Sequence, residues 1–241
     1  MRIGLFIPCY IDQFYPTAAI ATVELLEKYG VEVVYPLDQT CCGQPMANSG
    51  YEDLGKGTTD LFLRNFGGFD YIVAPSGSCT LHVKEHVIPK DSFRPHIYEL
   101  CEFLTDIIKV EEISSSYPHK VGLHASCHGV RGLDLAKPSE KVGTDYNKPL
   151  SLLEKVDGIE VVTLSRKDEC CGFGGTFAVF EEAVSVSMGN DRIEDHQRQG
   201  VEVITSADMS CLMHLEGLLK RKNSPIRVKH IAEILNGNPL N

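Results

Sequence analysis

The chain has 241 residues, of which 43% are hydrophobic and 23% charged, the usual proportions of a folded globular protein. Its formal net charge is -10, and an acidic surface repels polyphosphate, so nucleic acid is not expected as a partner. The sequence has neither a signal-peptide core nor an apolar stretch long enough to be a transmembrane segment, so a cytoplasmic location is expected.

The first half of the chain alternates short apolar runs with helix-like stretches. We predict three strands and three helices in alternation, with strands at 3–8, 31–35 and 71–74 and helices at 18–29, 51–66 and 81–87. This order is typical of a parallel sheet covered by helices. The stretch 88–119 follows, and its serines and Pro118 favour a linker.

The second half repeats the same order of elements. Strands are predicted at 120–124, 159–164 and 201–205, and helices at 150–156, 180–199 and 209–221. We therefore predict an α/β fold of two pseudo-symmetric parallel-sheet repeats packed together. A boundary near Tyr117 gives one repeat at 1–117 and the other at 118–241.

Eight of the nine cysteines repeat in a fixed order, which is a single cysteine, an adjacent pair followed by glycine, and a last single cysteine. These eight are Cys9, Cys41, Cys42 and Cys79 in the first half and Cys127, Cys170, Cys171 and Cys211 in the second. Similar tails, 96–100 and 230–234, follow the two sets. Cys101 has no counterpart, and its apolar surroundings predict an ordinary buried thiol.

Each of these cysteines comes just after a predicted strand, so the sets should meet at the carboxyl-end edges of two sheets, where ligands bind in open parallel sheets. Four converging thiolates repel one another unless a cation neutralises them, which zinc or an iron–sulfur cluster does. Neighbouring cysteines reach one small tetrahedral ion with difficulty, so a multi-iron cluster is favoured. Zinc in one repeat and a set of buried reduced thiols remain alternatives.

A few other residues suggest chemistry. His82 and His86 match the HxxEH pattern of some zinc peptidases, although an ordinary helix face explains so short a match. His128 and Arg131 follow Cys127 and are catalytic candidates, because each could donate a hydrogen bond to a cluster or to an anionic substrate. No GxGxxG fingerprint follows a predicted strand.

The cysteine motifs resemble those of a known family. The arrangement looks like the cysteine-rich CCG domain found in heterodisulfide reductase and in the glycolate oxidase iron–sulfur subunit. The segments CCGQP, ECCGFGGTF, SADMSCLMH and HIAEIL are more similar to the lactate utilization protein A group. This resemblance implies iron–sulfur binding by the eight repeated cysteines, with one or two clusters, and a part in L-lactate oxidation together with other iron–sulfur subunits.

The sequence departs from the heterodisulfide reductase motif at one place in each repeat. That motif ends in CxxC, which gives five cysteines and a non-cubane cluster, whereas Ser76 and Asp208 stand at the first of these positions here. Four cysteines per repeat suffice for an ordinary [4Fe-4S] cluster. Disulfide reduction at the cluster is therefore not implied.

These observations predict an electron-transfer subunit of a lactate-oxidising oxidoreductase complex. The rival interpretations are a heterodisulfide-reductase-like enzyme that acts at its cluster, and a zinc-stabilised scaffold without catalytic activity. His124, His128, Arg131 and the glycines of 172–175 surround the second set of cysteines, so we expect the second site to be the redox-active one.

Overall fold

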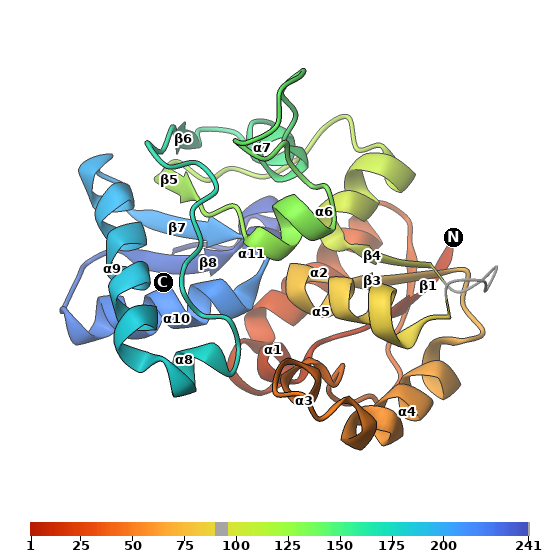
Figure 1. Cartoon of the computed structure of the whole chain (residues 1–241). Helices are drawn as coiled ribbons and strands as arrows, with labels where there is room; N and C mark the ends of the chain where they lie inside the picture. The colour runs from red at the N-terminus through yellow and green to blue at the C-terminus, as the bar shows by residue number, and fades with distance from the viewer. Residues whose placement is uncertain (90–95, 241) are drawn as a thin grey trace.

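Two four-stranded sheets, each with all strands parallel, form the framework of the protein (Figure 1). The computed structural model describes residues 1–89 and 96–240. The first sheet has the order β2-β1-β3-β4 and contains β1 (Arg2–Leu5), β2 (Glu32–Val34), β3 (Tyr71–Ala74) and β4 (His96–Glu99). The second has the order β6-β5-β7-β8 and contains β5 (Lys120–Leu123), β6 (Glu160–Val162), β7 (Val203–Ser206) and β8 (Arg227–His230). The predicted fold of two similar α/β repeats is confirmed.

The helices follow the strands in both repeats. In the first repeat they are α1 (Cys9–Phe14), α2 (Pro16–Lys28), α3 (Gln44–Asn48), α4 (Lys56–Phe66), α5 (Gly77–His82) and α6 (Leu100–Glu102). In the second they are α7 (Lys148–Leu153), α8 (Phe177–Phe180), α9 (Glu182–Arg198), α10 (Met209–Arg221) and α11 (Ile231–Asn236). A 3-10 turn, η1 (Glu52–Gly55), precedes α4, and π-helical turns η2 (Val83–Val87), η3 (Phe103–Ile108) and η4 (His128–Gly132) extend three other segments. No helix in the described residues is both long and apolar enough to cross a membrane.

The fourth strand of each sheet was not predicted. Part of the expected linker, 90–95, lies outside the described residues, but β4 and α6 occupy the stretch that follows it. Both missed strands lie at a sheet edge and are four residues long, and β8 carries the polar sequence RVKH. Both strands mix polar with apolar residues and so have little hydrophobic signal, whereas the edge strands β2 and β6 lie in longer apolar runs.

The structure also corrects the register of the two similar tails. β3 pairs Ala74 with Glu99, and β7 pairs Ser206 with His230, so Glu99 corresponds to His230. The predicted match set His230 against His96, three residues away. In the correct register, both residues cap the following helix, and each capping box is completed by a glutamate, Glu102 or Glu233.

Each repeat packs one of its helices against the other repeat. α11 packs on α2, and the corresponding α6 packs on α7, so the helix after the last strand of each repeat covers a helix that follows the first strand of the other. Lys28 Nζ donates a hydrogen bond to the Asn236 carbonyl at 3.0 Å in one of these contacts. One large core of buried apolar side chains includes residues of both sheets, and a second, smaller core around Phe6, Phe62 and Phe66 belongs to the first repeat. The strands change sheet between Glu99 and Lys120, and the boundary near Tyr117 stays a prediction.

Glu99 gives the fold a pH-dependent stability. Burial raises the pKa of this fully buried carboxyl to about 8, and its Oε1 has no hydrogen-bond partner among the residues that the structure describes. The folded pKa lies above the unfolded one, so the folded state binds the proton more tightly, and stability should fall as the pH rises from about 4.5 towards 8, by on the order of 4 kcal/mol. Urea unfolding of the metal-free protein at several pH values should show this decline. Glu99→Gln keeps an acceptor for the helix cap and should flatten it, and an equally steep decline in that variant would rule Glu99 out as its source.

Candidate metal centres

The four cysteines of the first repeat meet at the carboxyl-end edge of the first sheet. Cys9 begins α1 after β1, Cys41 and Cys42 precede α3 after β2, and Cys79 lies in α5 after β3. The thiol of Cys41 hydrogen-bonds with those of Cys9 and Cys42, and the thiol of Cys42 also with that of Cys79. The predicted convergence of these four residues is therefore present.

The second repeat has the same chain of thiol contacts. Cys170 hydrogen-bonds with Cys127 and Cys171, and Cys171 also with Cys211. The order of contacts matches the first repeat residue for residue. All nine cysteines are free thiols in the structure. Each set of four donors is of the kind that a structural zinc ion or a [4Fe-4S] cluster takes.

Each set of cysteines is half buried. The second residue of each pair and the last single cysteine are at most 5% exposed, namely Cys42, Cys79, Cys171 and Cys211. Cys9 is exposed, whereas Cys41, Cys127 and Cys170 are partly exposed. A centre held by either set would therefore have one side inside the protein and one side towards solvent.

Contacts among the thiols stabilise one thiolate in each set. Hydrogen bonds from Cys42 and Cys9 lower the pKa of Cys41 to about 2, and those from Cys127 and Cys171 lower the pKa of Cys170 to about 2. The same contacts raise the pKa of Cys42 and Cys171, whose sulfurs keep their protons. A metal that bound all four sulfurs would displace these remaining protons.

The glycine after each cysteine pair has a structural reason. Gly43 and Gly172 have φ angles of 91° and 86°, which residues with a Cβ rarely adopt. In this conformation the N–H of Gly43 donates to Cys41 Sγ, and that of Gly172 to Cys170 Sγ, both at 3.4 Å. These N–H contacts stabilise the negatively charged sulfurs.

Two histidines outside the predicted site residues contact the cysteine pairs. His82 and His214 each lie three residues after the last cysteine of their repeat, so one helical turn brings each back to the cysteine pair. The ring of His82 hydrogen-bonds to the backbone of Cys42, and that of His214 to the backbone of Cys171. The matching positions of these two histidines in the repeats were the feature of the sequence that could have identified them. His82 also stacks on His86, with ring centroids 5.1 Å apart.

Ser76 and Asp208 join the two repeats. They face each other in an isolated antiparallel bridge, and both are fully buried. The Tyr10 hydroxyl lies 2.8 Å from Ser76 Oγ and donates to Asp208 Oδ1 at 3.4 Å. Asp208 also accepts from the backbone N–H groups of Ser78 (2.7 Å) and Ser210 (3.2 Å). These donors use both oxygens of the carboxylate. Asp208, which stands where the heterodisulfide reductase motif has a cysteine, therefore stabilises the contact between the repeats.

The remaining candidate residues lie at the edge of the second site or away from it. His128 Nδ1 is 3.8 Å from Cys127 Sγ. The guanidinium of Arg131 forms ion pairs with Glu140 at 2.9 Å and Asp168 at 3.0 Å, so its donors are directed to the surface carboxylates. Cys101 is fully buried beside the Glu99 carboxyl, in agreement with the expected core thiol.

Comparisons with known proteins match this arrangement. The model of the cysteine-rich CCG domain matches residues 3–84 and 121–216, one match in each repeat. A lactate utilization protein A of Halalkalibacterium halodurans is 39% identical over 98% of this chain and 97% of its own length. The chain belongs to this family. Other members are those of Geobacillus thermodenitrificans, 41% identical, and Bacillus subtilis, 38% identical, and each match covers 98% of this chain and 99% of the relative.

The fold of this family member also occurs in a solved structure of distant sequence. A hypothetical protein from Helicobacter pylori matches it with a TM-score of 0.60 at 10% identity, over 100% of this chain. This chain spans about half of that protein, 49% of its length. At such low identity the likeness concerns the fold alone.

Proposed function

We propose that this protein is an iron–sulfur electron-transfer subunit of an L-lactate-oxidising complex. The observation that carries the proposal is the pair of equivalent four-cysteine clusters, each with one buried and one solvent-facing side. The lactate part comes from the family relatives, which are named for lactate utilization. An iron–sulfur cluster supplies one-electron transfer when bound.

In this proposal the eight repeated cysteines hold the metal centres. The adjacent pairs favour a multi-iron centre, because each pair directs two sulfurs into one site, where the second of them also hydrogen-bonds with the last single cysteine. The backbone N–H groups of Gly43 and Gly172 would donate to sulfur at each centre and stabilise added negative charge. Cys9 and Cys127 lie on the accessible side, where electrons would enter or leave.

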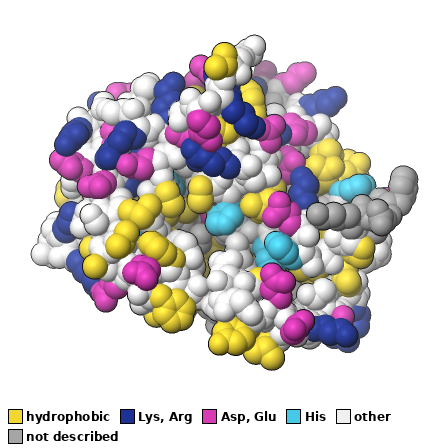
Figure 2. All heavy atoms as spheres, in the orientation of Figure 1, with side chains coloured by type: hydrophobic (Ala, Val, Ile, Leu, Met, Phe, Trp, Pro, Cys, Tyr) yellow, Lys and Arg dark blue, Asp and Glu magenta, His cyan; other side chains and the backbone are white. Residues whose placement is uncertain are grey.

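The surface beside the sites suits the docking of other subunits. Phe14, at the end of the helix that Cys9 begins, is 71% exposed, and Phe180, in the helix after the Cys171 segment, is 74% exposed. Figure 2 shows hydrophobic side chains gathered over the region of α8 and α9. Exposed apolar side chains that gather in a patch are typical of protein–protein contacts. We therefore propose that the other iron–sulfur subunits bind on this side.

The experiment that tests the proposed function follows the visible absorption of the complex. The protein is isolated without oxygen together with its co-purifying subunits, and L-lactate is added. We expect a visible thiolate-to-iron absorption that bleaches as electrons arrive, and no bleaching with D-lactate or buffer. A colourless protein that contains zinc would favour the scaffold interpretation. A coloured complex that L-lactate does not bleach, and whose chemically reduced form regains its colour when a disulfide substrate is added, would instead favour a cluster enzyme, because disulfide reduction takes electrons from the cluster.

A further inference from the structure

We propose that His124 is a fifth ligand of the second cysteine site, and that the first site has no such ligand. The inference rests on the proposed metal centre and goes beyond it, because it makes the two sites chemically different. It concerns a nitrogen ligand that the cysteine pattern does not predict.

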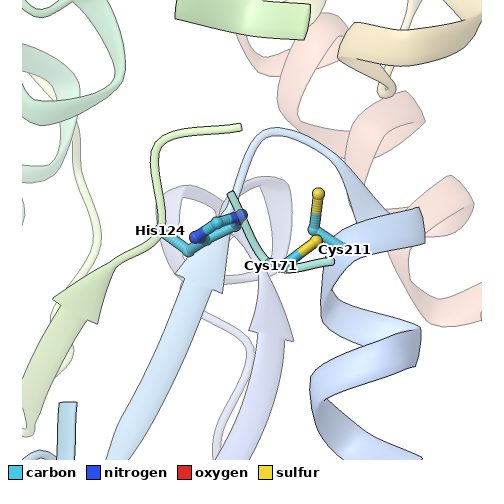
Figure 3. A group of neighbouring side chains, drawn as sticks. All are labelled: His124, Cys171 and Cys211. Atoms are coloured by element: carbon cyan, nitrogen blue, oxygen red, sulfur yellow. The ribbon is translucent and has the colours of Figure 1, made fainter. Parts of the chain in front are cut away.

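The first observation is distance. His124 follows β5, and a nitrogen of its ring lies within 4.8 Å of the sulfurs of Cys171 and Cys211, which are themselves this close to each other (Figure 3). Nitrogen and sulfur ligands of one metal ion are at most about 4.4 Å apart, given bond lengths of about 2.1 and 2.3 Å. Small side-chain rotations would therefore bring these three atoms within reach of one metal centre.

The second observation is the lack of any other partner for the ring. His124 is 1% exposed, and neither Nδ1 nor Nε2 has a hydrogen-bond partner among the described residues. Buried polar atoms nearly always have one. Whichever ring nitrogen carries no proton therefore keeps its lone pair for a metal.

The surroundings of the ring can also satisfy its second nitrogen. A cavity of about 10 Å³ next to His124 is lined by the polar residues Ser126 and Asn147 among others. This volume is about that needed for one water molecule. A metal-bound histidine usually donates its other N–H to such a partner.

The first repeat has an apolar side chain at the equivalent place. The N–H of Phe6 donates to Val73 O at the end of β1, as the N–H of His124 donates to Thr205 O at the end of β5. The Phe6 ring packs edge-on against Phe62 and Phe66, with centroid distances of 5.2 and 5.8 Å. The first site therefore has four sulfur ligands and an aromatic wall.

The second repeat replaces this aromatic wall with polar groups. Gly4 approaches Phe66, and the equivalent Gly122 approaches His196, so Phe66 and His196 occupy matching positions. Arg192, one turn before His196, is fully buried, and it donates to the Arg166 carbonyl and pairs with Asp195 at 3.4 Å. Arg192 and His196 therefore form their own network beside His124 and leave its ring nitrogens unpaired.

The test is a pulsed EPR measurement of nitrogen hyperfine coupling. The first site is disabled by Cys42→Ser, histidines are labelled with ¹⁵N, and the protein is prepared with iron and sulfide without oxygen and reduced. We expect a strong coupling between the paramagnetic centre and one imidazole nitrogen. The coupling should disappear in His124→Phe, which copies the first repeat, and remain in His128→Gln and His214→Gln.

The outcomes separate this inference from the proposed function. A second site that binds iron without any strong histidine coupling overturns the ligand assignment and leaves the proposed function intact. A second site that binds no iron overturns both. If His124→Phe does not fold, His124→Gln is compared with the labelled protein that keeps His124. A coupling that persists in the glutamine variant comes from another histidine and overturns the inference.

Discussion

Cys171→Ser is expected to remove the metal of the second site and to abolish lactate-dependent reduction of the assembled complex. Cys171 is 2% exposed, and its thiol joins Cys170 to Cys211, so its loss removes the middle of the donor set. Iron should fall by about half, because the first site keeps its four sulfurs. Iron analysis of the anaerobically purified variant, together with the absorption change on adding L-lactate, measures both effects.

Cys101→Ser is the matched control for this variant. Cys101 is also a buried cysteine, but it lies beside Glu99 in the hydrophobic core. The substitution should lower stability modestly, since it buries a hydroxyl in an apolar place, and should leave the iron content unchanged. Equal loss of iron from the two variants would show that the assignment of donors to repeats is wrong.

Asp208→Ala is expected to lower the free energy of unfolding by about 3 kcal/mol or more, because it leaves several buried donors unsatisfied at once. The carboxylate accepts from the hydroxyls of Ser78 at 3.2 Å and Ser210 at 2.7 Å, besides the backbone N–H groups of both residues. The bonds from Ser78 connect the two repeats, between α5, which carries Cys79, and the residue that caps α10, which carries Cys211. Urea unfolding of the metal-free protein measures the effect.

Two further variants define the cause of that loss. Asp208→Asn keeps the shape of the side chain and one acceptor oxygen, so its free energy of unfolding should lie between those of the parent protein and the alanine variant. Asp38→Ala removes an exposed carboxylate and should change stability by less than about 0.5 kcal/mol. An alanine variant at position 208 with the stability of the Asp38 variant would contradict the role of Asp208 at the junction.

Much of the fold could be predicted because the inner strands are buried on both faces. β1, β3, β5 and β7 are apolar runs flanked by helix-like stretches, and predicted and observed bounds differ by a few residues. β4 (HIYE) and β8 (RVKH) could not be recognised in this way, since each has at most two apolar residues, whereas the other edge strands, β2 and β6, lie in longer apolar runs. Their pairing depends on the neighbouring strand, which local sequence does not encode.

The candidate sites were predictable to a similar degree. The order of the eight cysteines, repeated after parallel strands, was enough to predict that each set of four meets at a sheet edge. The contribution of His82 and His214 was visible only as a matching spacing. His124 lacks a hydrogen-bond partner among the described residues because polar side chains of α9 stand where the first repeat has Phe62 and Phe66. A single sequence does not show that α9 packs there.

The measurement that tests the central claim most directly is the content of iron, acid-labile sulfide and zinc in the protein purified without oxygen. Two iron–sulfur centres predict iron and sulfide in equal amounts, up to about eight of each per chain for two [4Fe-4S] clusters, with little zinc. Zinc in both sites without sulfide would contradict the account, and so would a protein that binds no metal while its cysteines stay reduced.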